Sequence, residues 1–346
     1  MSQFDLRELG WTPDLAENLE PGLEPGRVAA AHRGAFDVWM EAGEVRLSLP
    51  GKLVHEGIDV GVGDWVGVGD GLIRSVLPRR SAIVRNAAGF ATTAQTLAAN
   101  VDVAFVLSSL GPDLEPRRIE RYLVTIWESG ATPEIVLTKA DRMEDPWELV
   151  AAVEAIAPGV PVHVVSSLTG QGTEALRARI QPGETAVLLG SSGVGKSTLV
   201  NRWLGEDVMA TNETRADDDE GRHTTTVRQL LVLPGGGLVL DSPGIRELQL
   251  WDVGSGALDA TFSDVEELAA ECRFADCTHE HEPGCAVLAA IETGALPADR
   301  FASWRKLQRE LLAIEIRHNA LLRKQEVAKW KQRGREGKAR AAAKRR

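Results

Sequence analysis

The chain has 346 residues, of which 43% are hydrophobic and 26% charged, and its net charge at pH 7 is −11. This length allows two or three domains with ordinary hydrophobic cores. The absence of a long apolar stretch argues against membrane-spanning helices, and an N-terminus rich in Asp and Glu is unlike a secretory or transit signal. With only three cysteines, a disulfide framework is excluded, and we expect a cytoplasmic protein.

The chain opens on two segments of different character. Residues 1–24 contain Pro13 and Pro21 and predict a flexible arm in which no chemistry is visible. From residue 25 to 80, short alternating runs separated by glycines predict a small closed β-barrel.

The composition of the predicted barrel does not by itself predict RNA binding. Between Arg27 and Arg80 there are seven Lys or Arg and seven Asp or Glu, whereas an RNA-binding barrel face is expected to be basic, with exposed aromatic rings. We expect Trp39 and Trp65 in the core rather than on such a face.

From residue 104 to 241, apolar runs typical of strands alternate with helical patterns at 117–129 and 147–157. This alternation predicts a mostly parallel sheet covered by helices, that is, an α/β domain.

A candidate base-reading motif, Thr138-Lys139-Ala140-Asp141, follows the apolar run 134–137. A carboxylate at Asp141 can accept two hydrogen bonds from guanine, whereas adenine lacks that donor pair and would leave the carboxylate unpaired. Thr138 stands where most GTPases have Asn, so we expect the loss of an amide that braces the phosphate loop. Ser166 and Ser167 follow another short strand and are the second candidate base contact.

The strongest motif is residues 190–197, which fit the phosphate-binding pattern G-x-x-x-x-G-K-[ST] directly after a predicted strand. Its glycines allow backbone N–H groups to surround phosphates, Lys196 reaches the β and γ oxygens and serves catalysis, and the Ser197 hydroxyl holds Mg²⁺. The predicted nucleotide contacts here are Gly190, Ser191, Ser192, Gly193, Val194, Gly195, Lys196, Ser197 and Thr198.

Two further pieces look like the remaining boxes of a translation-factor-type GTPase: the threonine run 224–226, and residues 241–244 after a strand. Thr224 or Thr225 would complete the Mg²⁺ shell, Asp241 would hold Mg²⁺ through water, and the N–H of Gly244 would contact the γ-phosphate. Because the base-reading boxes precede the phosphate loop, the motif order predicts a circularly permuted domain.

The chain lacks the glutamine that usually orients the attacking water. Ile245 follows Gly244 where Ras-like enzymes have a glutamine that orients water, so slow intrinsic turnover is predicted. His223 is the nearest polar candidate for that role, and solvation of its side chain is the alternative. The acidic run 205–221 before it is expected to be disordered without a partner.

A cysteine and histidine cluster follows, and it contains every cysteine of the chain. Three thiolates and one imidazole suit a closed, tetrahedral structural Zn²⁺ site. The predicted ligands are Cys272, Cys277, His279 and Cys285. His281 is the competing ligand, expected beside the metal site or in solvent, and three buried free cysteines are the alternative to any metal site.

The C-terminal segment, residues 317–346, has twelve Lys or Arg and two Glu, a net charge of +10 that leaves −21 for the rest of the chain. A basic helical tail of this kind favours RNA contact through phosphates. A solvated tail that merely offsets the acidic body is the alternative.

Taken in this order, the motifs resemble those of the ribosome small subunit-dependent, circularly permuted GTPases of the RsgA/YjeQ family. The resemblance covers roughly residues 25–300 and also rests on residues 98–102, 221–226 and 241–247. It implies an OB-fold at 25–80, a permuted GTPase domain at 99–248 and an α-rich zinc domain at 249–316. The predicted segments around these domains are the arm at 1–24, a linker at 81–98 and the basic tail at 317–346.

The resemblance further implies GTP or GDP, Mg²⁺ and one structural Zn²⁺ as cofactors. The expected partners are the 30S subunit and its 16S rRNA, without membrane contact, and the protein is expected to be a monomer. We expect a late-stage assembly checkpoint whose GTP hydrolysis is stimulated by the subunit and coupled to release. A small-molecule kinase and a scaffold with structural nucleotide are the rival interpretations.

Overall fold

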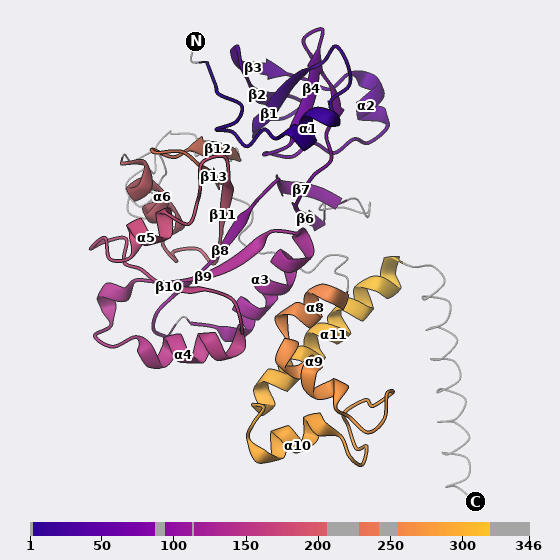
Figure 1. Ribbon diagram of the computed structural model, residues 1–346, viewed down its shortest axis with the longest axis vertical. Helices are drawn as coiled ribbons and strands as arrows, with labels where there is room; N and C mark the ends of the chain where they lie inside the picture. Colours follow the sequence, from indigo (N-terminus) through magenta and orange to yellow (C-terminus); the bar gives the residue numbers. More distant parts are fainter. Residues whose placement is uncertain (1–2, 87–93, 113, 206–227, 242–254, 319–346) are drawn as a thin grey trace, which may run out of the picture.

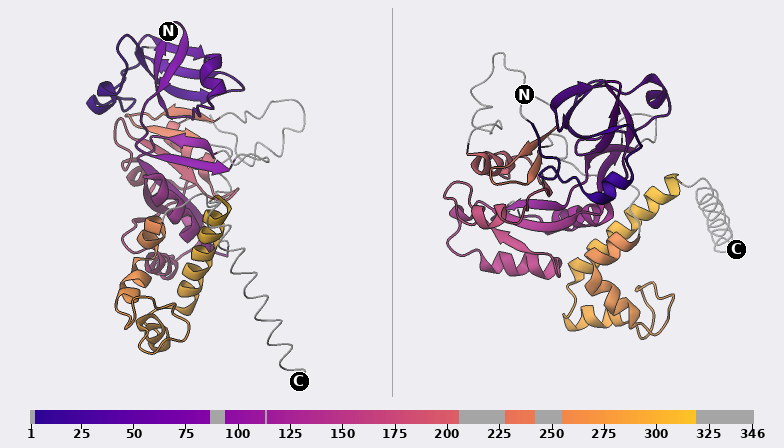
Figure 2. Two further views of the ribbon diagram at one scale, coloured as in Figure 1. Left: turned by 90° about the vertical axis from the view of Figure 1, so that its right-hand side faces the viewer. Right: turned by 45° about the horizontal axis from the view of Figure 1, so that its top comes forward.

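The computed structural model describes residues 3–86, 94–112, 114–205, 228–241 and 255–318. These residues form a β-barrel, a central sheet flanked by helices, and a helical body, arranged along the long axis of the molecule (Figures 1 and 2). No helix in these ranges is both long enough and apolar enough to cross a bilayer. The three predicted domain types are therefore confirmed.

The barrel consists of five antiparallel strands around a small core. The strands are β1 (Glu24–Ala31), β2 (Phe36–Met40), β3 (Gly43–Leu47), β4 (Trp65–Gly69) and β5 (Leu72–Val76), and helix α2 (Gly51–His55) follows β3. Strand β1 pairs with β2 and β4, and the Ile73 N–H donates to the Ser48 carbonyl where β5 meets the end of β3. Trp65 and Trp39 are 1% and 8% exposed, so their prediction as core residues is confirmed.

The N-terminal arm is packed rather than loose, so that expectation is wrong for residues 3–23. Helix α1 (Pro13–Glu17) carries Leu15 into the main core together with Leu9. Gly10, at φ +90°, approaches the loop before the phosphate-binding strand so closely that a Cβ would lie 2.4 Å from the Gly183 carbonyl oxygen. The arm therefore seals the junction of the barrel and the central domain.

The central sheet has the order β10-β9-β8-β11-β13-β12, and it is parallel except for β12. Its strands are β8 (Val103–Ser109), β9 (Thr132–Thr138), β10 (Val162–Val164), β11 (Thr185–Leu189), β12 (Gln229–Val232) and β13 (Leu238–Asp241). Strand β11 is apolar on both faces because it lies in the middle of the sheet with helices on either side.

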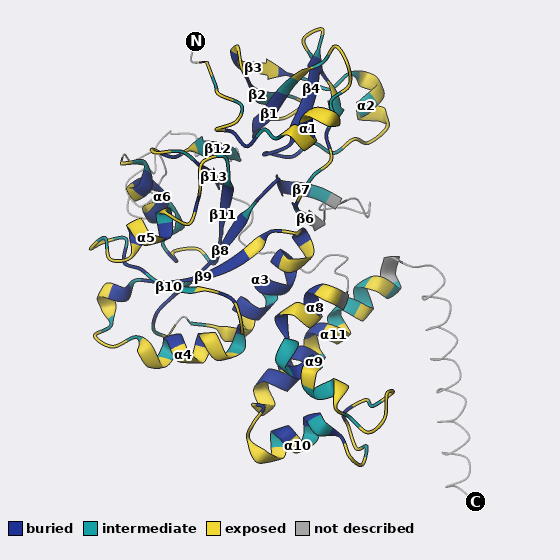
Figure 3. Cartoon of the chain, viewed as in Figure 1, coloured by how far each residue is buried: buried dark blue, intermediate teal, exposed yellow. Residues whose placement is uncertain are grey.

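The helices cover both faces of this sheet. Helices α3 (Pro116–Ser129) and α4 (Trp147–Ile156) pack on one face, and α5 (Thr173–Arg177) and α6 (Lys196–Leu204) pack on the other. Figure 3 shows the central strands buried and the outer side of α4 exposed. The helices predicted at 117–129 and 147–157 are confirmed to within one residue at each end.

The barrel and the central sheet are continuous, because β1 also pairs with β12 at Ala30 and Gln229. Arg27 on β1 is fully buried at this junction. Its guanidinium donates to the Leu9 carbonyl and, at 2.6 Å, to the Thr185 hydroxyl. Burial lowers the pKa of Arg27 to about 10. One side chain thus joins the arm, the barrel and the strand that leads to the phosphate loop.

The predicted linker 81–98 is instead an antiparallel hairpin of β6 (Ala82–Asn86) and β7 (Ala94–Ala99). Its inward side chains Ile83 and Leu97 are 1% exposed and belong to the main core. The segment between the barrel and the central domain is therefore part of the folded body.

The helical body contains α8 (Ser255–Thr261), α9 (Ser263–Ala270), α10 (Ala286–Thr293) and α11 (Ala298–His318). It is fixed to α3 by a buried ion pair, in which Arg300 Nη1 donates to Glu120 Oε1 at 2.7 Å. Arg300 also pairs with Asp264 at 2.8 Å, and the Ser303 hydroxyl donates to the other oxygen of Glu120. We call the group Glu120, Asp264, Arg300 and Ser303 the domain latch.

Candidate functional site

The candidate site begins in the loop between β11 and α6. Three glycines there have positive φ, namely Gly190 at 148°, Gly193 at 75° and Gly195 at 104°. A Cβ on Gly190 would lie 2.5 Å from the Leu107 carbonyl oxygen, so only glycine fits where the loop leaves the strand. Helix α6 starts at Lys196 directly after the loop, and its free N–H groups and positive dipole end favour an anion.

Lys196 lies folded over this loop. Its Nζ donates to the carbonyls of Gly190 and Ser191 at 2.8 and 2.7 Å. Ser197 stands next to it in the first turn of α6, with a half-buried side chain. A cation, a hydroxyl and a glycine-rich backbone thus meet at one helix start, a combination that fits the phosphates of a nucleotide.

Thr138, at the end of β9, supports the loop between β11 and α6 through a hydrogen bond. Its buried hydroxyl donates to the Val194 carbonyl at 2.7 Å. The amide that most GTPases have at this position is absent, but the shorter threonine side chain reaches the backbone carbonyl directly and supplies a brace of its own. Residues 138 and 194, which are far apart in sequence, are connected by one hydrogen bond.

The two candidate base-reading segments also meet. The hydroxyl of Ser166, which is fully buried, donates to Asp141 Oδ1 at 2.5 Å and accepts from the Thr169 N–H at 3.2 Å. Lys139 adopts φ +60°, which turns the chain so that Asp141 is exposed at the edge of the sheet. The carboxylate is thus held in a fixed place while remaining open to a ligand.

A further contact, which the sequence did not suggest, connects this corner with α6. Arg202 Nη1 donates to the Ser167 carbonyl at 3.1 Å. An arginine in the last turn of a helix carries no local signal for such a role, because its partner is 35 residues away in the sequence. The helix that starts at the phosphate loop thus also supports the base-reading loop.

The remaining predicted nucleotide contacts are only partly within the described residues. Asp241 ends β13, whose neighbour in the sheet is β11, so its backbone lies beside the strand that leads into the phosphate loop. The predicted residues Thr224, Thr225, Gly244 and the catalytic candidate His223 lie outside the described residues, as do Ile245 and residues 206–221 of the acidic run.

A second cluster lies in the helical body, where Cys272, Cys277, His279 and Cys285 place one donor atom each within 4.8 Å of one another. His279 Nδ1 lies 3.6 Å from Cys272 Sγ and 3.4 Å from Cys285 Sγ. Four donors at these separations fit a closed tetrahedral zinc site, and Nδ1 is the nitrogen that faces it. His281 is not a member of this group.

The loop that carries the cluster is organised by a carboxylate. Glu282 accepts hydrogen bonds from the N–H groups of Thr278, Glu280 and His281 and from the Thr278 hydroxyl. The Thr278 hydroxyl and these N–H groups lower the pKa of Glu282. Glu282 therefore shapes the loop between the second and the fourth candidate ligand.

The pKa shifts in the cluster are mixed, because burial raises the pKa of the Cys277 thiol to about 11 whereas the pKa values of His279 and Cys272 are lowered. Burial lowers the pKa of His279, which favours the neutral imidazole that ligates metals. Burial alone would raise the pKa of Cys272, but the N–H groups of Ala286 and Val287 at the start of α10 lower it below its usual value. Cys285 caps the same helix, since its Sγ accepts from the Leu288 N–H at 3.4 Å.

Comparison with known proteins shows the family of the chain. A family model described as RsgA GTPase matches residues 76–251. The small ribosomal subunit biogenesis GTPase RsgA of Streptomyces avermitilis is 49% identical over an alignment covering 99% of this chain and 96% of the relative. RsgA 1 of Oceanobacillus iheyensis is 46% identical, with 82% and 84% covered.

Two solved structures are similar over most of the chain. YjeQ from Thermotoga maritima matches with a TM-score of 0.63 and 29% identity, covering 84% of this chain and 98% of that chain. YloQ, described as a circularly permuted GTPase, matches with a TM-score of 0.61 and 25% identity, covering 84% and 96%.

Proposed function

The chain belongs to the RsgA family of circularly permuted GTPases, and from this premise we propose that it acts as a late checkpoint in assembly of the 30S ribosomal subunit. It hydrolyses GTP, as its family does, and the names of its relatives support a role in biogenesis of the small ribosomal subunit. The finer part of the proposal is that docking on the subunit stimulates hydrolysis and that hydrolysis releases the protein.

The contact between Ser166 and Asp141 carries the nucleotide part of this proposal. It holds a guanine-reading carboxylate at the same sheet edge as the loop that Thr138 braces. The base would be read by Lys139, Asp141, Ser166 and Ser167, and the phosphates would be bound by residues 190–198, with Thr224, Thr225 and Gly244 completing the site. An adenine nucleotide would leave Asp141 without its two donors, which disfavours a kinase that uses ATP.

Ser197, Thr225 and Asp241 are the proposed Mg²⁺ ligands, because they supply the hard oxygens that this ion prefers. Mg²⁺, when bound, neutralises charge on the β and γ phosphates. Lys196 adds a fixed positive charge at the loop where that charge develops. We propose His223 as the residue that positions the attacking water, since Ile245 cannot do so.

Cys272, Cys277, His279 and Cys285 are the proposed zinc ligands. Zinc, when bound by four protein ligands, leaves no open position for catalysis and stabilises the fold. Within this proposal the helical body is a structural module that helps the protein to dock.

The basic segment 317–346 is proposed as the main 16S rRNA contact, because the rest of the chain carries a net charge of −21 and would be repelled by phosphates. Binding of this kind weakens steeply with salt.

We further propose that the domain boundaries at 25–80, 99–248 and 249–316 mark the OB, GTPase and zinc units. We also propose that the protein is a cytoplasmic monomer.

Co-sedimentation with purified 30S subunits tests the proposal. We expect the full chain to sediment with subunits when loaded with a non-hydrolysable GTP analogue and to stay in the supernatant with GDP. A chain ending at residue 318 is expected to bind more weakly and with a smaller salt dependence. Equal sedimentation with both nucleotides would contradict the proposed switch.

A further inference from the structure

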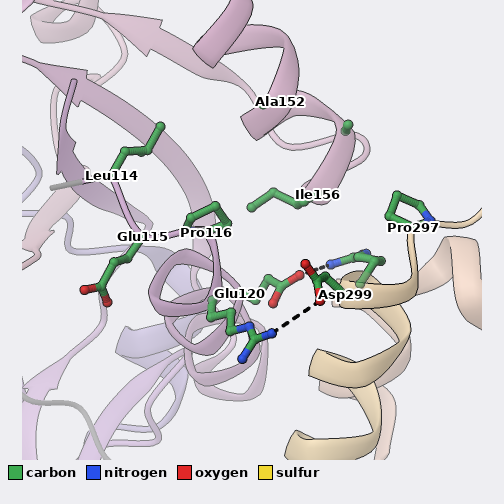
Figure 4. Close-up of a pocket in the computed structure, with 11 residues that line it drawn as sticks. Leu114, Glu115, Pro116, Glu120, Ala152, Ile156, Pro297 and Asp299 are labelled. Atoms are coloured by element: carbon green, nitrogen blue, oxygen red, sulfur yellow. Dashed lines mark hydrogen bonds and ion pairs between the residues drawn. The ribbon is translucent and has the colours of Figure 1, made fainter. Parts of the chain in front are cut away.

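A cavity of about 520 Å³ lies where the central domain meets the helical body (Figure 4). It is lined by the start of α3, the second half of α4 and the turn before α11. Most of this lining is apolar, from Leu114, Pro116, Ala152, Ala155, Ile156 and Pro297. Its volume is in the range of pockets that enclose a ligand or a few side chains.

The floor of the cavity is rigid. Glu120 and Arg300, the central pair of the domain latch, line it with side chains 3% and 2% exposed. Arg300 lies over the Phe262 ring at 4.1 Å and also donates to the Thr261 carbonyl at 2.8 Å. Both charges are satisfied within the protein, so the cavity offers an incoming group a fixed apolar surface rather than an ionic partner.

The rim is acidic on the α4 side. Between Arg142 and the end of α4 at Ile156 the sequence contains four Asp or Glu and no Lys or Arg. Glu148 lies one helical turn before Ala152 and is exposed on the same side of α4. On the opposite rim the charges are matched, since Arg117 lies 3.7 Å from Asp299 and Arg118 lies 2.9 Å from Glu115.

From this combination we infer that the cavity receives apolar side chains of a basic protein segment belonging to the small ribosomal subunit. The inference rests on the proposed function for the identity of the assembly, and on charge and shape for the class of partner. Carboxylates beside the cavity attract a cationic chain and repel nucleic acid phosphates. An apolar side chain buried at the centre of such a contact supplies most of its energy.

Photo-crosslinking can identify what occupies the cavity. A benzophenone amino acid replaces Ala155, which lines the cavity, and in a matched control it replaces Ala151, which is exposed on α4 but does not line the cavity. Each full-length protein is loaded with the GTP analogue, mixed with purified 30S subunits and irradiated. We expect position 155 to crosslink to a basic stretch of one ribosomal protein and position 151 to crosslink far less. Crosslinks to rRNA, or none, would overturn the inference.

A charge substitution gives a second readout. Ala152→Arg places a cation at the cavity and is expected to weaken 30S binding about tenfold, whereas Ala151→Arg is expected to change it less than about twofold. Thermal melting and GTP affinity, measured for both variants, should equal those of the parent, because both sites are exposed alanines away from the nucleotide site. Equal binding by the two variants would overturn the inference.

Failure of the inference and failure of the proposed function give different results. If the parent protein does not sediment with 30S subunits, the proposed function fails, and the inferred subunit partner fails with it. If the parent sediments but the paired variants behave alike, only the inference fails.

Discussion

The nucleotide site and the cysteine cluster are held together in different ways. The nucleotide site joins the ends of strands β9, β10 and β11, so that Thr138 meets Val194 and Asp141 meets Ser166 beside a buried sheet. The cluster draws its four candidate ligands from one segment, 272–285, most of which is exposed. The first site is therefore shaped by the core before any ligand arrives, whereas the second, in our proposal, depends on bound zinc.

This difference predicts which kind of change should damage each region. Removal of a metal should act on the helical body and leave the nucleotide site intact. Loss of a single hydrogen bond at the sheet edge should damage the nucleotide site and leave the helical body intact. The domain latch between Glu120 and Arg300 is where the two regions can influence each other.

The largest effect is expected from loss of zinc. Structural zinc contributes about 10–16 kcal/mol of apparent binding energy in small zinc domains. We expect one zinc per chain by elemental analysis, none in Cys277→Ser, and loss of protection of α9 and α10 in hydrogen exchange. GTP affinity should change less than about twofold.

His281→Ala is the matched control for the zinc experiment, because His281 lies beside the cluster but outside the four donors. It should retain zinc and protection. Zinc loss in this control, or a collapse of GTP binding in Cys277→Ser, would break the separation of the two regions.

A smaller loss of stability, which should affect both regions, is expected from Glu120→Ala. It removes one of the two carboxylates that pair with the buried Arg300, and breaking a buried ion pair costs about 3–5 kcal/mol of unfolding free energy. Urea unfolding measures this, with Glu115→Ala, an exposed carboxylate nearby, as control. The double change of Glu120→Ala with Arg300→Met should recover part of the loss. An unchanged midpoint in Glu120→Ala would show that the latch does not stabilise the junction.

Lys196→Ala should act on the nucleotide site alone. Loss of a charged hydrogen-bond donor to phosphate is worth about 1.5–3 kcal/mol, or roughly 10- to 100-fold in GTP affinity. Fluorescent nucleotide titration measures this. The exposed Lys52→Ala on the barrel is the control and should bind like the parent. A normal GTP affinity in Lys196→Ala would contradict the proposal that this loop binds the phosphates of GTP.

The smallest effect is expected from the brace. Thr138→Val keeps the shape of the side chain but removes the donor to the Val194 carbonyl, which should weaken GTP binding about fivefold, or about 1 kcal/mol. Thr138→Ser retains the hydroxyl and should bind within about twofold of the parent. A loss in Thr138→Ser with none in Thr138→Val would mean that the methyl group, and not the hydrogen bond, supports the loop.

The sequence alone predicted the elements whose signals are local. The strand before Gly190, the helices near residues 117 and 147, and the Cys/His spacing all depend on neighbouring residues, and the structure contains each of these elements. The motif order also predicted the permutation, because order is read directly from the chain.

Long-range contacts could not be predicted in this way. Glu120 and Arg300 are 180 residues apart, and nothing in either local pattern indicates the other. The comparison of Thr138 with Asn predicted the loss of an amide, but it could not show that the Val194 carbonyl lies within reach of the threonine hydroxyl. The arm was expected to be loose because of its prolines, yet Leu9 and Leu15 anchor it in the core.

The central claim is that this GTPase is switched by the small ribosomal subunit, and the rate of phosphate release from GTP tests it most directly. The measurement compares GTP and ATP, with and without purified 30S subunits, at fixed low salt. The account predicts slow release alone, a many-fold increase that requires both GTP and subunits, and little release from ATP. A rate from GTP that stays unchanged on adding subunits, despite tight GTP binding, would contradict it.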